Sequence, residues 1–311
     1  MTGTLRWLAR RLALSVLVLL GAATLAFGAL QLAPGDPVQI VLGGTAATPA
    51  SVAQVRSDLG LDDPLIVRYG DFLGHLVRGD LGHSFQLNAD VSDVIRDQLG
   101  PTVQLALAGF VLALGLALLL ALATAGRRPW LRALSSTGEL VLSSSPSFWV
   151  GILLLTLLSF RWHLFPATGG TGLDGLVLPA LTLAAGMVGP FAQVLREGME
   201  NVLREPFALS AMARGTSRSA LLTRHALRHA LIPLVTLSGW AVGTLLSGAV
   251  VIETVFTRQG LGRVMATAIS GRDLPMVTGV VVISALAFVL INLVVDLLYR
   301  VVDPRLREAQ L

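Results

Sequence analysis

Residues 204–233 read REPFALSAMARGTSRSALLTRHALRHALIP, and the rest of the chain is organised around this polar stretch. It is rich in arginine, and an apolar segment long enough to cross a bilayer flanks it on each side. Pro206 follows Glu205 at a position that suits the first turn of a helix, and helix-forming residues come after it. Gly215 can adopt a positive φ and end that helix, and a second helix is expected from Ser217. The stretch therefore predicts a short helix at the membrane face, held between two membrane helices.

Apolar segments account for most of the remaining chain. Its 311 residues are 54% hydrophobic, and the mean hydropathy is +0.74. A helix that rises about 1.5 Å per residue needs about 20 apolar residues to cross a hydrocarbon core of about 30 Å. Because lipid offers the backbone no hydrogen-bond partners, each span is expected to be helical. We predict an all-α polytopic membrane protein with six transmembrane helices, at residues 12–32, 102–125, 140–160, 176–195, 231–252 and 276–295.

The arginines indicate how these spans are oriented. Lysine is absent, so all 23 basic residues are arginine, and 15 of them fall on the side of the N-terminus. Of the 19 acidic residues, 12 fall on the opposite side. Cytoplasmic segments of membrane proteins carry the excess of basic residues. Both termini are therefore predicted to be cytoplasmic, and the net charge of +4 is better explained by topology than by binding to nucleic acid.

The residue types that are missing exclude several kinds of chemistry. The chain has no cysteine, which removes disulfides, thiol catalysis and cysteine metal sites. It has no lysine, which removes the Walker A lysine of P-loop ATPases. His225 and His229 have the spacing of metal ligands on a helix, but several arginines nearby would repel a cation. We therefore predict no enzymatic activity, no metal site and no cofactor bound by this chain.

The alternation of polar and apolar segments predicts a division of the chain. Residues 1–11 are a basic cytoplasmic N-terminus, residues 12–32 are the first transmembrane helix, and residues 33–100 are an extracytoplasmic segment. Residues 101–311 form the remaining core, which contains a cytoplasmic coupling loop at residues 199–230. The apolar run of the first span is longer than the core of a secretory signal, which favours an uncleaved helix.

The extracytoplasmic segment is expected to hold helices of its own. Residues 51–59 and 65–76 have the pattern of short amphipathic helices, and residues 90–99 are predicted to form a third. Pro101 is expected to open the second span, because proline is tolerated at a helix start. Pro146 is expected to kink the third span.

Three polar residues are candidates for contact with a transported molecule. Asp36 follows the first span, Glu253 stands at the outer end of the fifth, and Asn292 lies inside the sixth. Glu253 is the best candidate for a polar group at the mouth of a pathway, whereas Asn292 also suits hydrogen bonding between helices. Gly239 and Gly243, four residues apart in the fifth span, fit either a helix-packing face or a pore lining.

Several short motifs point to one family when they are taken together. In the inner loop Ala211 is followed by Gly215, and Pro233 lies 18 residues after that glycine. Other motifs accompany this pattern: Ala33-Pro34-Gly35-Asp36-Pro37, Leu61-Asp62-Asp63-Pro64, Gly79-Asp80-Leu81-Gly82-His83-Ser84, Pro146-Ser147-Phe148-Trp149, Glu253-Thr254-Val255-Phe256 and Asp303-Pro304-Arg305-Leu306-Arg307. In this order they resemble the permeases of type I ABC importers, in the dipeptide, oligopeptide and nickel branch. The inner loop is similar to their EAA loop, although Leu209 and Ser210 replace the usual Glu and first Ala.

The resemblance implies a type I importer permease fold that forms half of a translocation pathway in a prokaryotic cell membrane. It implies four kinds of partner: a second homologous permease subunit, two cytoplasmic ABC ATPase subunits that use ATP and Mg, an extracytoplasmic substrate-binding protein, and the lipid bilayer. The long outer segment and the six spans are similar to the first of the branch's two permease types. Peptides are the expected cargo, with nickel complexes and haem as alternatives. The expected ATPase-coupling residues are Glu205, Phe207, Ala208, Ala211, Met212, Arg214 and Gly215.

Other classes of membrane protein fit the sequence less well. A secondary transporter is expected to carry ionisable groups near the membrane midplane and internal repeats, and neither is visible. An intramembrane hydrolase would need a nucleophile with a base or a pair of intramembrane acids, and the sequence offers no such motif. A structural membrane subunit remains an alternative, but it would not explain the arginine-rich inner loop.

Overall fold

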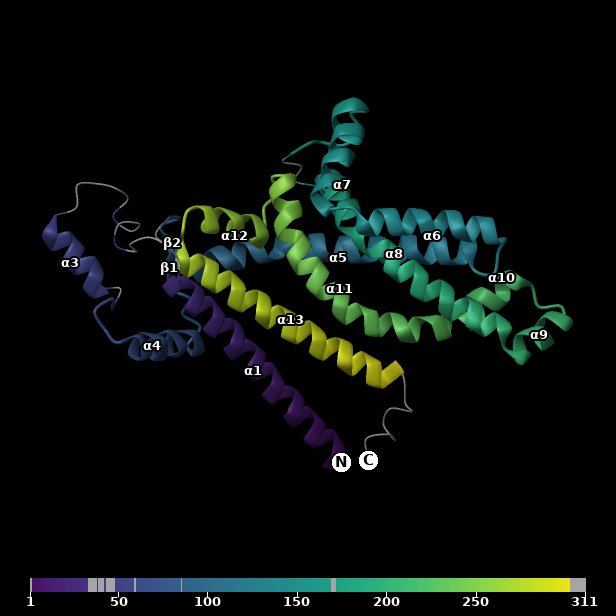
Figure 1. The fold of residues 1–311 in the computed structure, drawn as a ribbon, viewed down its shortest axis with the longest axis horizontal. Helices are drawn as coiled ribbons and strands as arrows, with labels where there is room; N and C mark the ends of the chain where they lie inside the picture. The colour runs from purple at the N-terminus through teal and green to yellow at the C-terminus, as the bar shows by residue number, and fades with distance from the viewer. Residues whose placement is uncertain are drawn as a thin grey trace. The chain divides into compact units, whose positions relative to one another are not determined.

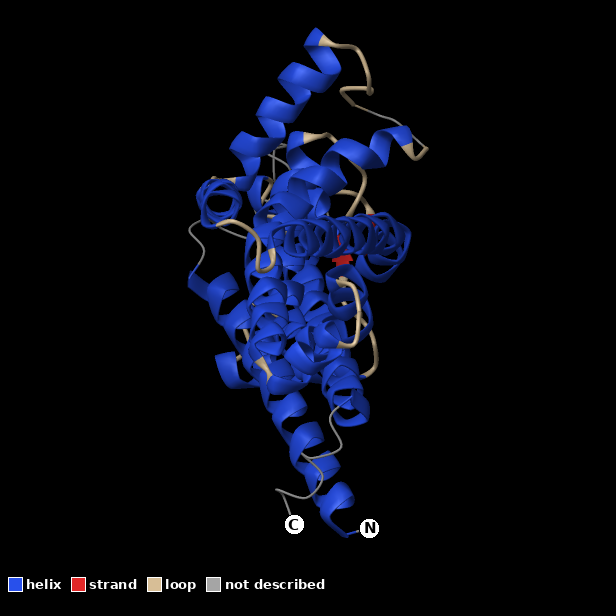
Figure 2. Ribbon diagram, turned by 90° about the vertical axis from the view of Figure 1, so that its right-hand side faces the viewer, coloured by secondary structure: helices blue, strands red, loops and turns tan. Residues whose placement is uncertain are grey.

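The computed structural model of the protein describes residues 2–32, 38, 42, 48–58, 60–84, 86–168 and 172–302. The described residues form helices and one short hairpin of two strands, drawn in blue and red in Figure 2. The chain divides into two compact units, which are described separately below. Unit 1 comprises Met1–Gly100 and Arg263–Val289, and unit 2 comprises Pro101–Gly262 and Leu290–Leu311.

The elements are labelled in Figure 1. Their bounds are α1 Thr2–Leu32, α3 Pro49–Asp58, α4 Leu65–Val77, β1 His83–Ser84, β2 Ala89–Asp90, α5 Val91–Thr124, α6 Pro129–Ser144, α7 Ser147–Leu154, η1 Leu155–Arg161, α8 Asp174–Arg204, α9 Pro206–Ala213, α10 Arg218–Leu221, η2 Leu222–Ala226, α11 Leu227–Val255, α12 Leu261–Ser270 and α13 Leu274–Val302. Within the described ranges, five helices are long and apolar enough to cross a membrane, and the number is six if the bent pair formed by α6 and α7–η1 is one span. The predicted all-α polytopic fold class is confirmed.

The third predicted span is broken rather than kinked. Helix α6 ends at Ser144, and the helical run that follows from Ser147 is turned from it by 104°. Pro146 explains the break, because a residue before proline is driven out of the helical region and Ser145 has the extended angles φ −80° and ψ 135°. The prediction of a single helix at residues 140–160 was therefore wrong at this point.

The second predicted span has no break at its proline. The sequence predicted a short helix at residues 90–99 and a new helix from Pro101, whereas α5 runs through Pro101 as one helix of 34 residues. Proline removes one backbone hydrogen bond and crowds the preceding residue. Gly100 has no side chain to be crowded, so the helix can continue. The boundary between the two units falls between these two residues.

In unit 1, an aromatic cluster joins α1 to α4. The ring of Phe27 on α1 lies 5.2 Å from that of Tyr69 and 5.5 Å from that of Phe72, both on α4. The hydroxyl of Thr24 shares a 2.7 Å hydrogen bond with the hydroxyl of Tyr69. Helix α4 is therefore amphipathic, as predicted. Helix α3 spreads its polar residues around its circumference, so the amphipathic pattern predicted for it was wrong.

A buried hydrogen bond ties the hairpin of unit 1 to the start of α13. The hydroxyl of Ser84 on β1 is buried and donates to the carboxylate of Asp273, which is itself buried. Asp273 also accepts a 3.3 Å hydrogen bond from the N–H of Met276 in the first turn of α13. One turn later, a side chain on Gly279 would begin only 2.4 Å from Val91. The hairpin and the start of α5 are thus fitted against α13 without room for a larger residue.

Two exposed carboxylate–histidine pairs lie at this hairpin, one within it and one just before it. Asp80 accepts hydrogen bonds from the N–H of Gly82 and from His75, each 2.9 Å long, and these lower the pKa of Asp80. Asp90 lies 3.0 Å from the ring nitrogen of His83 and raises the pKa of that histidine. The hydrogen bonds of Asp80 stabilise the folded state fully above the ordinary pKa of this carboxyl, and the stabilisation is lost as pH falls through the lowered pKa. The pairing of His83 stabilises the folded state fully below the ordinary pKa of this histidine, and the stabilisation is lost as pH rises through the raised pKa.

Helix α8 is the centre of unit 2. It packs against α6, α7 and α11, and α11 runs in a similar direction in Figure 1. Phe191, Leu195 and Met199 on α8 are completely buried. A side chain on Gly198 would begin 2.8 Å from the backbone of Ala230 in α11, so the two helices approach through small residues.

Candidate functional site: the inner-loop helix and its support

The short helix predicted in the inner loop is present as α9. Glu205 precedes it in extended geometry, and Gly215 follows it with a φ of +89°. The N–H of Gly215 donates to the carbonyl of Met212 over 3.0 Å, and the N–H of Thr216 donates to that of Ala211 over 3.1 Å. This pair of bonds is a Schellman motif, which depends on the left-handed conformation that glycine adopts at little cost. The predicted end of the helix is confirmed.

Large apolar side chains on α9 are exposed. The exposed fractions are 45% for Phe207, 62% for Leu209 and 38% for Met212. Ala208 is completely buried, so this predicted coupling residue packs against the rest of unit 2 and is not part of the exposed surface of α9. The other predicted coupling residues lie at the surface: Glu205, Arg214 and Gly215 are exposed, and Ala211 is half-buried.

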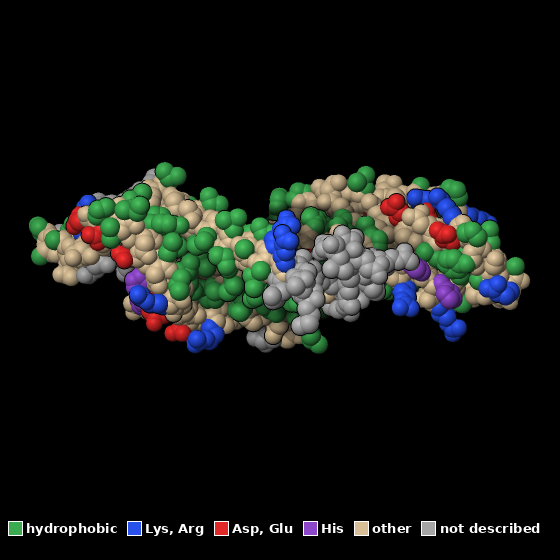
Figure 3. Space-filling view, turned by 90° about the horizontal axis from the view of Figure 1, so that it is seen from below, with side chains coloured by type: hydrophobic (Ala, Val, Ile, Leu, Met, Phe, Trp, Pro, Cys, Tyr) green, Lys and Arg blue, Asp and Glu red, His purple; other side chains and the backbone are tan. Residues whose placement is uncertain are grey.

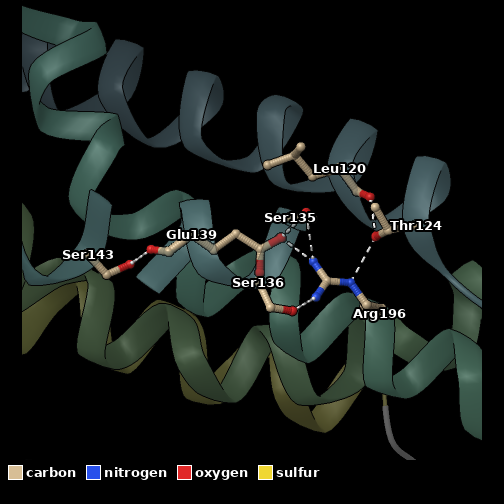
Figure 4. A network of polar contacts seen from close by, with 7 residues as sticks. All are labelled: Leu120, Thr124, Ser135, Ser136, Glu139, Ser143 and Arg196. Carbon is tan, nitrogen blue, oxygen red and sulfur yellow. Dashed lines mark hydrogen bonds and ion pairs between the residues drawn. The ribbon is translucent and has the colours of Figure 1, made fainter. Parts of the chain in front are cut away.

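A buried ion pair supports the helix that leads into α9. Arg196 of α8 binds the carboxylate of Glu139 on α6, and both side chains are less than 5% exposed at 4% and 2%. Figure 4 shows the guanidinium surrounded by hydroxyls. It donates to Thr124 of α5 over 2.8 Å, to Ser136 over 2.8 Å and to Ser135 over 3.4 Å. Three helices are therefore joined through one arginine, in a region with little water to replace a lost partner.

A second set of contacts holds the turn between α5 and α6. Glu200 of α8 pairs with Arg132 at 2.9 Å and accepts a 3.3 Å hydrogen bond from the N–H of Gly126. Arg218 of α10 donates to the carbonyls of Ala125 and Gly126 at the end of α5. Helix α9 lies between α8 and α10 in the sequence, and both are fixed to the same turn. Movement of α9 is therefore expected to carry the ends of several membrane helices with it.

Glu253 has a structural position rather than the predicted place at a pathway mouth. Its carboxylate is completely buried and accepts hydrogen bonds of 2.7 Å from the hydroxyl of Thr102 and 2.7 Å from the N–H of Gly262. The hydroxyl of Thr102 in turn accepts a 2.8 Å bond from the N–H of Leu261. A side chain on Gly260 would begin 2.2 Å from the carboxylate. Glu253 and Thr102 therefore satisfy the first N–H groups of α12, and the buried carboxylate is not placed to meet a passing substrate.

Asn292, the second pathway candidate, lies at a contact between helices. Asn292 is half-buried on α13. A Cβ atom added to Gly239 would lie 3.2 Å from the side-chain oxygen of Asn292. A side chain on Gly248 would begin 2.8 Å from Leu183 on α8. Gly239, one of the two glycines predicted to pack or to line a pore, thus lies at a contact between helices, and so does Gly248. Asp36 lies outside the described residues.

Comparison with known proteins identifies the family. Residues 99–308 match the family "Binding-protein-dependent transport system inner membrane component", and residues 4–106 match its N-terminal counterpart, "Binding-prot-dependent transport system membrane comp, N-term". The chain belongs to this family. It is 37% identical over 311 residues to a Brucella abortus (strain 2308) protein provisionally named as a peptide transport system permease, with 96% of this chain and 98% of the relative covered. It is 34% identical over 304 residues to the glutathione transport system permease of Salmonella typhimurium, with 97% and 99% covered.

Membership in this permease family confirms the resemblance drawn from the motifs. The ion pair between Arg196 and Glu139 is the feature of this permease that sequence reasoning missed. Arg196 directly follows the predicted span at residues 176–195, and Glu139 directly precedes the predicted span at residues 140–160. The signal that could have found the pair is the presence of two opposite charges within or beside otherwise apolar spans, because such charges need a partner there.

Proposed function

We propose that this protein is the permease subunit of an ATP-driven importer and forms half of a pathway for short peptides. Helix α9 is the observation that carries the proposal. It presents exposed Phe207, Leu209 and Met212, ends rigidly at Gly215, and is joined through α8 to the buried Arg196. Exposed apolar side chains on a rigid, supported helix suit docking into a cleft of a soluble partner. The large apolar surfaces of the other helices are accounted for by lipid.

The proposed partners follow from the architecture of the family. A second, homologous permease would complete the pathway, and a substrate-binding protein would deliver the cargo on the outer side. Two cytoplasmic ATPase subunits would bind ATP and Mg and move α9 when they close. This chain would then bind neither cofactor itself. The excess of arginine on the side of α9 supports a cytoplasmic position for that helix in a prokaryotic inner membrane, with both termini on the same side.

Peptide is the proposed cargo because the relatives are named for peptide and glutathione transport, and glutathione is itself a short peptide. Nickel complexes and haem are the alternatives within the same architecture. In this proposal the binding protein determines specificity, and the buried Glu253 is not a selective group of the pathway.

Reconstitution of the complete transporter in liposomes tests the proposal. Leu209→Arg places a charge on the most exposed apolar position of α9, and Thr223→Arg places the same charge on an exposed residue of η2. We expect Leu209→Arg to reduce dipeptide uptake and peptide-stimulated ATP hydrolysis by about tenfold or more, since the loss of a central interface contact costs about 2 kcal/mol. Thr223→Arg should stay close to the unaltered transporter.

Three results would contradict different parts of this proposal. Normal uptake and stimulated ATP hydrolysis in Leu209→Arg would remove the docking role of α9. Uptake of nickel complexes or haem, but not of labelled dipeptides or glutathione, would remove the peptide assignment and leave the docking role intact. Uptake that continues without ATP and without the ATPases would indicate a secondary transporter.

A further inference from the structure

A groove of about 570 Å³ opens beside α9, and arginine is the residue type that lines it most often. It is bounded by the turn between α5 and α6, the first turns of α6, the end of α8, and parts of α9 and α10. Four arginines line it, whereas Glu200 is its one acidic lining residue. In Figure 3, arginine and histidine side chains gather at the right-hand end of unit 2, where Figure 1 places α9 and α10. The arginines of the groove are Arg127, Arg132, Arg204 and Arg218.

Two of these arginines are already engaged within the protein. Arg132 pairs with Glu200 at 2.9 Å, and Arg218 donates to the carbonyls at the end of α5. The carboxylate of Glu200 is therefore neutralised by Arg132 and does not offset the remaining charge. Arg127 and Arg204 have no side-chain partner in the part of the chain that the structure describes. The groove thus holds two guanidinium groups whose donors are available to an anion.

The rest of the groove suits a ligand that is only partly polar. Leu203, Met212 and Pro129 contribute apolar surface to its lining. Trp130, the next residue along α6, is 59% exposed, and Leu134 one turn later is 67% exposed. Exposed tryptophan and leucine beside arginine are typical of the boundary between lipid headgroups and acyl chains. The groove therefore adjoins a surface that lipid would cover.

We propose that this groove binds the phosphate of an anionic phospholipid from the inner leaflet, through Arg127 and Arg204. Guanidinium groups form paired, charge-assisted hydrogen bonds with phosphate oxygens. Basic pockets at the cytoplasmic ends of membrane helices are suited to anionic headgroups. The apolar lining would receive the glycerol backbone and the first acyl carbons. The inference does not depend on the transported molecule, although it rests on the proposed cytoplasmic position of α9.

A bound lipid would lie against the moving part of the transporter. Met212 belongs both to the exposed surface of α9 and to the groove, and Arg218 follows α9 directly. A headgroup held between α6 and α8 would therefore contact α9 and restrict its position. The lipid composition of the membrane would then influence how readily the helix responds to the ATPases.

The test uses the purified full-length chain in zwitterionic detergent, without partner subunits. Short-chain phosphatidylglycerol, short-chain phosphatidylcholine and inorganic phosphate are each titrated while binding is followed by native mass spectrometry. We expect phosphatidylglycerol to bind in preference to phosphatidylcholine, and inorganic phosphate to bind much more weakly because it lacks the apolar part. Arg127→Gln and Arg204→Gln should each weaken the binding by about fivefold, and the double variant by about 25-fold.

Arg128→Gln is the matched control, since Arg128 is exposed in the same turn but does not line the groove. Equal weakening in this control would overturn the site in favour of non-specific attraction to positive charge. Equal affinity for inorganic phosphate and the lipid would overturn the lipid assignment in favour of a free anion. If the double variant binds phosphatidylglycerol as tightly as the unaltered chain, Arg127 and Arg204 do not hold the headgroup and the proposal fails. Because binding is measured without transport, these outcomes are distinct from a failure of the proposed function.

Discussion

At the scale of single residues, Arg196 and Glu139 form an ion pair in unit 2 whose two side chains are almost completely buried. Each charge was removed from water at a cost of several kcal/mol, and the partner together with the surrounding hydroxyls offsets that cost. The pair links α8 to α6, and the bond to Thr124 adds α5. Such a pair contributes little net stability compared with apolar residues of the same size, but the loss of one partner is severe. The pair instead determines which faces of these helices pack together.

This reasoning predicts the effect of breaking the pair. Arg196→Gln leaves the carboxylate of Glu139 buried without its cation, so the free energy of unfolding should fall by about 3–5 kcal/mol. The double variant Arg196→Met with Glu139→Leu should recover most of that loss. Denaturant unfolding in detergent, followed by tryptophan fluorescence, measures both values. Arg56→Gln is the control, since its pair with Asp62 is exposed and should change stability by about 1 kcal/mol or less. Equal losses in Arg196→Gln and Arg56→Gln would contradict the proposed role of burial.

At the scale of elements, the end of α9 depends on the backbone conformation of one glycine. A side chain on Gly215 would meet nothing within 4 Å, so any cost of Gly215→Ala comes from its φ of +89° alone. We expect a loss of about 1–2 kcal/mol, seen as faster hydrogen exchange in α9. Gly186→Ala provides the comparison, because Gly186 also has open space around it but lies within helix α8. That substitution should be neutral or stabilise by about 0.5–1 kcal/mol. Unchanged exchange in Gly215→Ala would show that the left-handed conformation does not limit the helix.

The elements also show which structural features the sequence predicts and which it does not. The end of α9 was predictable because proline, helix formers and glycine act locally, within a few residues of one another. The ion pair was not, because Glu139 and Arg196 are 57 positions apart and only packing brings them together. The two prolines had opposite outcomes for a local reason: Gly100 tolerates Pro101 inside a helix, whereas Ser145 becomes extended before Pro146. The buried position of Glu253 depends on the fold of the loop after it, which no spacing rule foresaw.

At the scale of the whole molecule, topology is the property on which the functional proposals depend. Docking of ATPases on α9 and binding of an inner-leaflet lipid both require the loop at residues 199–230 to be cytoplasmic. The same topology places residues 33–100 on the outer side. The uneven distribution of arginine supports this orientation, since charged segments of this kind cross a membrane with difficulty. The orientation can be measured directly by labelling single cysteines from one side of the membrane.

The absence of cysteine makes that measurement simple, since the natural chain is already free of thiols. Ser57 on α3 and Ser219 on α10 are both exposed, so Ser57→Cys and Ser219→Cys should disturb the fold little. In intact cells, a membrane-impermeant maleimide should label the cysteine at position 57 and leave the one at position 219 unlabelled. Permeabilised cells should show both labelled, which controls for the accessibility of each thiol. The reverse pattern in intact cells would invert the topology and remove both the ATPase docking surface and the lipid site, because neither could then face the cytoplasm.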